Sequence, residues 1–145
     1  PIADGDMAAL TGLAGDSVRR LLTLHAGGGL SLYRRVLAIL VAPRLDSAAV
    51  HKLAGDLTGA ANEQTFDAFN AILRDLLARL LRHAATGAGG LAGEEALAAR
   101  YAAGDRLVRL AEAYELIEQR RSAAAALNLD RRTYVVEAVA AIAAA

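Results

Sequence analysis

The feature that most constrains the fold is an apolar repeat in the middle of the chain. Its members, which follow one another at intervals of three or four residues, are Phe66, Phe69, Leu73, Leu76 and Leu80. In an α-helix this spacing places the side chains on one face, as in the seam of a helical bundle. The repeat therefore predicts a long amphipathic helix, which we expect to open at Asn62.

The rest of the chain predicts further helices and no strand. Hydrophobic residues make up 55% of the sequence and aromatic residues only 4%, so alanine, leucine and valine must fill the interior. Alanine and leucine are among the residues that favour helices most. The other helices are expected over 6–14, 18–25, 30–41, 47–57, 94–125 and 131–143. The helix over 94–125 is expected to kink near Gly104. We predict an all-α fold of seven helices, two short ones followed by a five-helix bundle with short antiparallel connections.

Glycines, prolines and capping residues indicate where these helices begin and end. Three consecutive glycines, 27–29, are costly inside a helix, so we place a boundary there, between a unit over 1–27 and a unit over 28–145. Pro43 should end the helix that precedes it. The residues that can cap a following helix are Asp16 or Ser17, Asp46 and Asp130, and the acidic pair Glu94–Glu95 also suits a helix N-terminus.

The composition excludes several classes of protein. Lys+Arg and Asp+Glu number 16 each, so the net charge is zero and gives no general attraction to nucleic acid. The absence of cysteine excludes disulfides, thiolate catalysis and cysteine zinc sites, and fits a cytoplasmic location. We expect no membrane span. The chain begins at Pro1 without an initiator methionine or a basic signal region, so we expect its start to lie inside a longer protein.

The residue types that carry chemistry are dispersed. His25, His51 and His83 lie on different predicted helices, without a ligand partner three or four residues away, and we expect them at ordinary surface or boundary positions. The carboxylates that have an arginine about one turn further on form the pairs Asp75–Arg79, Asp105–Arg109 and Glu118–Arg121. We expect solvent-facing ion pairs from them, because acid–base catalysis needs carboxylates that converge on one cleft.

Neither glycine cluster, 27–29 or 87–90, follows a strand or precedes Gly-Lys-Ser/Thr, so both are expected to be linkers and not phosphate loops.

The basic spots of the sequence are 19–20, 34–35, Arg79 with Arg82, 120–121 and 131–132. Adjacent arginines on a helix diverge by about 100°, so these spots predict solvated faces and subunit contacts and not one DNA groove. No catalytic residue, metal site or cofactor is expected in this chain.

Four motifs resemble the C-terminal part of clamp-loader delta-prime subunits of the bacterial DNA polymerase III. They are LAGDSVRRLLTL at 13–24, GGLSLY at 28–33, FNAILRDLLARLL at 69–81 and ALNLDRR at 126–132, directly before the last apolar helix. Their order and spacing follow the family over nearly the whole chain, and the alanine-rich composition is similar to alphaproteobacterial members. In the second helix Ser17 matches the family serine, with Asp16, Val18 and Arg19 where glycine, proline and glycine are usual.

The resemblance implies an assembly role and no catalysis in this part of the protein. Residues 1–27 would be the end of the AAA+ lid and 28–145 the collar that joins loader subunits. Arg20 matches the family's sensor-2 arginine, the implied cofactor-binding residue. The implied partners are the gamma/tau and delta subunits through the collar, with the sliding clamp and primer–template DNA reached only through the whole complex.

An alternative stays open on the sequence alone. A ligand-binding or dimerising helical regulatory domain of a transcription repressor would also be all-α. It would pair through a two-helix face and enclose an apolar pocket, usually with more aromatic residues than the few dispersed ones in this chain.

Overall fold

The computed structural model describes residues 4–15, 17–26, 28–59, 63–87, 90–101, 104–127 and 130–145, the side chains of 124–127 excepted. Helices and no strand occur within these ranges, so the predicted all-α class is confirmed. The helices are α1 (Asp4–Ala14), α2 (Val18–Ala26), α3 (Gly29–Val41), α4 (Ser47–Leu57), α5 (Glu63–Thr86), α6 (Glu95–Tyr101), α7 (Arg106–Leu127) and α8 (Arg131–Ala144).

The single helix predicted over 94–125 is wrong, because the described chain forms two helices there. Helix α6 ends at Tyr101, and α7 begins at Arg106. Gly104 between them has φ 60°, a left-handed conformation that a continuing right-handed helix does not contain. The expected kink is therefore a complete break, and the residues that the structure describes form eight helices instead of the seven predicted.

The predicted caps are confirmed wherever the structure describes them. The Ser17 hydroxyl accepts a hydrogen bond from the Arg20 N–H at 3.2 Å, and the Asp46 carboxylate accepts one from the Ala49 N–H at 3.2 Å. Asp130 accepts one from the Arg132 N–H at 3.0 Å. Each bond satisfies an N–H group that has no partner inside its helix. Asp16, Asn62, Asn128 and Leu129 lie outside the described residues.

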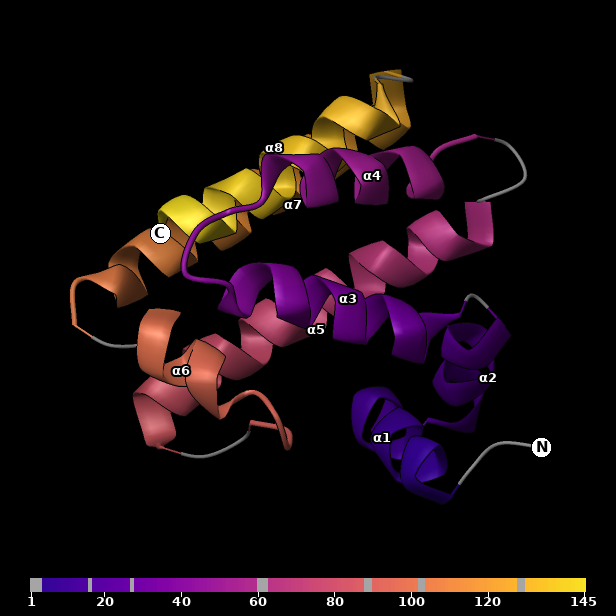
Figure 1. Cartoon of the computed structure of the whole chain (residues 1–145), viewed down its shortest axis with the longest axis horizontal. Helices are drawn as coiled ribbons and strands as arrows, with labels where there is room; N and C mark the ends of the chain where they lie inside the picture. Colours follow the sequence, from indigo (N-terminus) through magenta and orange to yellow (C-terminus); the bar gives the residue numbers. More distant parts are fainter. Residues whose placement is uncertain are drawn as a thin grey trace.

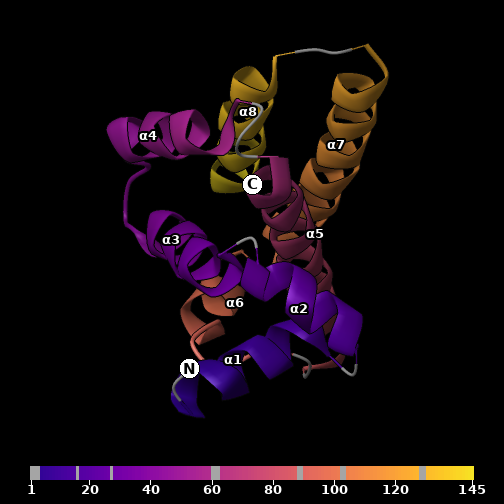
Figure 2. The same ribbon diagram turned by 90° about the vertical axis from the view of Figure 1, so that its right-hand side faces the viewer.

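Helix α5 is the centre of the arrangement (Figure 1). All five members of the predicted apolar repeat on α5 are buried, which confirms that face as the seam of the bundle. Helices α3, α6 and α7 pack against α5, while α8 packs between α4 and α7. Figure 2 shows α7 and α8 side by side and antiparallel, at the opposite end of the molecule from α1.

The two N-terminal helices share the apolar core of the rest. Leu10, Leu13 and Leu24 are buried in one cluster with the residues of α3 to α8. At the glycine run, Gly28 has φ 68°, and a Cβ on Gly29 would lie 2.7 Å from the Leu24 carbonyl oxygen. These glycines allow a tight turn between α2 and α3, whereas the division into two domains at this point stays a prediction.

Candidate interaction surface

The histidines lie at the surface, as their dispersal in the sequence predicts. His25 and His51 are exposed, and His83 is half-buried. Among the residues that the structure describes, no group of three or more His, Asp or Glu side chains could hold a metal ion. No described helix is long and apolar enough to cross a membrane.

Of the three predicted ion pairs, the one between Glu118 and Arg121 is formed. Asp105 and Arg109 are both exposed, and among the described residues they do not form an ion pair with each other. The Arg121 Nη2 donates to the Glu118 carboxylate at 3.0 Å, one helical turn away. Asp75 does not pair with Arg79; it pairs with Arg20 of α2 instead. Asp75 therefore joins α5 to α2, and the Arg20 guanidinium, which the family resemblance would direct toward nucleotide, contacts a carboxylate of this chain.

Arg79 is buried, and its partner is Glu94, which directly precedes α6. The Arg79 Nε donates to Glu94 Oε1 at 2.9 Å and its Nη2 donates to Oε2 at 2.8 Å, the two-point geometry that arginine and carboxylate favour. Tyr33 of α3 donates its hydroxyl to the same carboxylate at 2.7 Å, and the Leu91 N–H donates to it at 3.0 Å. We call Tyr33, Arg79 and Glu94 the buried latch.

Burial and hydrogen bonding shift the titration of this latch. Burial alone would raise the pKa of Glu94, but hydrogen bonds from Arg79, the Leu91 N–H and Tyr33 outweigh it and hold that pKa below its usual value. Burial, and then the neighbouring Glu94 carboxylate, raise the pKa of Tyr33. At neutral pH the latch therefore contains one cation, one anion and one neutral phenol.

The latch fixes α3, α5 and the start of α6 to one another and has no open face toward a substrate. Arg79 has only 10% of its side chain exposed and Glu94 2%. A signal for its burial exists in the sequence, because Arg79 lies three residues after Leu76 and seven after Ile72, inside the apolar stripe of α5. The prediction that the Glu94–Glu95 pair serves mainly as a charged helix N-terminus misses this role of Glu94.

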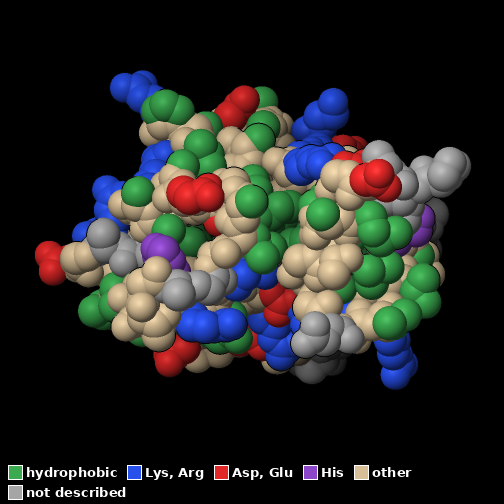
Figure 3. All heavy atoms as spheres, turned by 90° about the horizontal axis from the view of Figure 1, so that it is seen from below, with side chains coloured by type: hydrophobic (Ala, Val, Ile, Leu, Met, Phe, Trp, Pro, Cys, Tyr) green, Lys and Arg blue, Asp and Glu red, His purple; other side chains and the backbone are tan. Residues whose placement is uncertain are grey.

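The remaining basic spots pair with carboxylates at the surface. The ion pairs that these spots form are Arg34–Asp6 and Arg35–Asp56 at 2.9 Å, Arg131–Glu63 at 3.7 Å and Arg120–Glu137 at 3.8 Å. On the face shown in Figure 3, Lys and Arg side chains are interspersed with Asp and Glu. The predicted solvated faces are confirmed for these arginines, and the face in Figure 3 carries charges of both signs.

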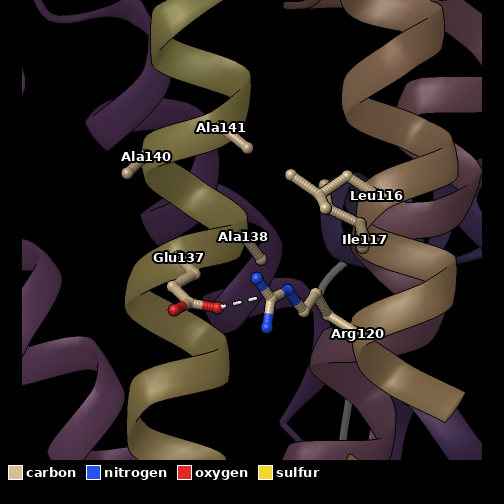
Figure 4. Close-up of a pocket in the computed structure, with 7 residues that line it drawn as sticks. All are labelled: Leu116, Ile117, Arg120, Glu137, Ala138, Ala140 and Ala141. Atoms are coloured by element: carbon tan, nitrogen blue, oxygen red, sulfur yellow. Dashed lines mark ion pairs between the residues drawn. The ribbon is translucent and has the colours of Figure 1, made fainter. Parts of the chain in front are cut away.

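An apolar hollow lies at the surface between α7 and α8, and we call it the α7–α8 groove. Its lining residues are Leu116, Ile117 and Arg120 of α7 and Glu137, Ala138, Ala140 and Ala141 of α8. Its volume is about 340 Å³. Ile117 and Ala138 are buried, whereas Leu116 keeps 43% of its surface exposed. Figure 4 shows Leu116 pointing from α7 toward Ala141 of α8.

Small side chains on α8 create this hollow. Alanine at 138, 140 and 141 leaves space along the side of the helix, which larger side chains would fill. The Arg120–Glu137 ion pair crosses the groove at one end (Figure 4). An apolar hollow with a charged end can accept an aliphatic side chain from another helix, but it contains no nucleophile or acid–base pair.

Comparisons of the chain with models of protein families, with characterised proteins and with solved structures found no match.

Proposed function

We propose that this chain is a non-catalytic assembly module of the clamp-loader delta-prime type, made of the end of a lid and a collar. In this role it joins the gamma/tau and delta subunits of a loader that places the sliding clamp on primed DNA. The observation that carries the proposal is the order of the four resembling motifs along one helical chain. The arrangement of the helices supports it, as follows.

All four motifs coincide with helices or helix ends that organise the bundle. The motif over 13–24 contains the Ser17 cap and most of α2, and the motif over 28–33 opens α3. The motif over 69–81 is the buried centre of α5. The last motif closes α7, and its Asp130 caps α8. The sequence signals of the family are thus the residues that begin or pack helices here, as expected of a scaffold.

The site chemistry also favours contact with other proteins. The buried latch has no open face, Arg20 is paired with Asp75, and the apolar groove faces solvent. These features supply rigid helices and surfaces for docking. No phosphate loop occurs in the sequence, so nucleotide would be bound by other parts of the loader.

Mixing with loader subunits tests the proposal. The chain should form a stable complex with the collar regions of gamma/tau and delta, measured by light scattering after size exclusion. A helical protein of similar size serves as the control and should elute separately. If the chain elutes unchanged from mixtures with both partners, taken singly and together, the proposal is wrong.

The second candidate is a ligand-binding or dimerising helical regulatory domain. The α7–α8 groove favours it, because an apolar hollow between two antiparallel helices is a common place for a small ligand. Small apolar molecules that raise the unfolding temperature of the chain, and lose that effect when Ala141 is replaced by phenylalanine, would support this candidate.

A further inference from the structure

We propose that a second copy of this chain docks on the α7–α8 groove in solution, forming a two-fold symmetric pair. This inference goes beyond the loader proposal and does not rest on it. It follows from the shape and the charges of the groove.

The groove contains both an exposed apolar side chain and a hollow. Leu116 points across the groove toward Ala141 with 43% of its surface exposed, and Ala140 and Ala141 line the space beside it. A two-fold axis brings the same patch of each copy together, so every feature must fit its own copy. Leu116 of each copy can then enter the alanine-lined hollow of the other, as a knob enters a hole.

The charges at the rim are complementary to themselves. Arg120 and Glu137 give the rim one cation and one anion, with 55% and 48% of their side chains exposed. Their separation within one copy is 3.8 Å, at the long end for an ion pair, so each retains capacity for a second partner. A two-fold pair places Arg120 of one copy near Glu137 of the second copy.

The whole chain presents no charge barrier to pairing. Its formal net charge is zero, so two copies do not repel one another over long distances. A partner rich in one charge would leave either Arg120 or Glu137 opposed by a like charge. The rim therefore favours a second copy over a strongly acidic or strongly basic partner.

Sedimentation equilibrium over a concentration series tests the pairing. The chain should pass from monomer to dimer as its concentration rises. Leu116→Glu should weaken the dimer at least about tenfold, because it places a charge inside an apolar contact. The matched control is Leu22→Glu, which changes an exposed leucine of α2, a helix that Figures 1 and 2 show apart from α7 and α8; this variant should dimerise like the parent.

A charge exchange between two chains tests the geometry of the rim. Arg120→Glu gives a rim with two anions and Glu137→Arg gives a rim with two cations, so each variant alone should dimerise more weakly. An equimolar mixture should regain the dimer, because the two altered rims complement one another. A role of the ion pair within one copy would give no such recovery in the mixture.

Several results would overturn the pairing. They are a chain that stays monomeric throughout the series, a Leu116→Glu variant that dimerises like the parent, a Leu22→Glu variant that is equally weakened, and a mixture of charge variants without recovery. Binding of a loader subunit or of an apolar ligand at the groove of a monomeric chain would also overturn it. If a loader subunit binds at the groove of a monomeric chain, the pairing is wrong but the proposed loader function stands. The two proposals therefore fail separately.

Discussion

Removal of the Glu94 carboxylate should destabilise the fold more than removal of any exposed ion pair. In Glu94→Ala, Arg79 keeps its charge in a site where only 10% of its side chain is exposed, and the Tyr33 hydroxyl and the Leu91 N–H lose their acceptor. Breaking a buried ion pair from one side costs about 3–5 kcal/mol. For a chain of this length, at about 3 °C per kcal/mol, the unfolding temperature should fall by roughly 10–15 °C.

Chemical denaturation with circular dichroism, together with thermal melts, measures this loss. The matched control is Asp56→Ala, which removes the carboxylate of the half-exposed Arg35–Asp56 pair and should cost less than about 1 kcal/mol. In the double variant Arg79→Met/Glu94→Gln no charge remains buried, so it should be more stable than Arg79→Met alone. A loss below about 1 kcal/mol in Glu94→Ala would refute the reasoning, since water would then be solvating Arg79.

Three further predictions concern pH, close packing and capping. The pKa of Glu94 is lower in the folded chain than in the unfolded chain. The latch therefore stabilises the fold at pH values above the unfolded pKa, about 4.3, and this contribution is lost as the pH falls through the folded pKa. Urea titrations from neutral to acidic pH should therefore show a shallower loss of stability in Glu94→Gln; an equal slope would contradict the assignment. Gly29→Ala should destabilise the chain by about 1–3 kcal/mol in urea unfolding, because its Cβ would lie 2.7 Å from the Leu24 carbonyl oxygen, and an unchanged midpoint would contradict this packing. Asp46→Ala should cost about 1 kcal/mol through loss of the hydrogen bond from the Ala49 N–H, whereas Asp46→Asn should retain most of that stability.

Local patterns were sufficient to predict most of the helices. The α5 repeat shows its buried face through spacing alone, and Ser17, Asp46 and Asp130 cap helices through bonds to residues two or three positions away. Such features depend on interactions within one turn, so they can be read from neighbouring residues.

The break between α6 and α7 depends on contacts distant in sequence. The Tyr101 hydroxyl donates to the Leu40 carbonyl at 3.1 Å, and Arg100 donates to the Val41 carbonyl at 3.3 Å and to that of Pro43, just beyond α3, at 3.2 Å. These contacts fix the end of α6 against α3, while Gly104 allows the chain to turn. A single glycine in a helical pattern cannot distinguish a kink from a break without these tertiary contacts.

The candidate site was the least predictable part of the molecule. Arg79 lies in an apolar stripe, which signals burial, but its carboxylate partner is 15 positions away and could not be chosen from sequence. Ile117 continues the three- and four-residue spacing of Leu107, Leu110 and Tyr114, so the sequence indicates that Ile117 faces the core and that Leu116 does not. The hollow beside Leu116 depends on the packing of α8 against α7, which the sequence does not show.

Native mass spectrometry of the chain mixed with gamma/tau and delta subunits tests the central claim most directly. The loader proposal predicts an assembly that contains one copy of this chain together with both other subunits. Spectra in which the chain occurs only by itself, as monomer or as its own dimer, would contradict that proposal.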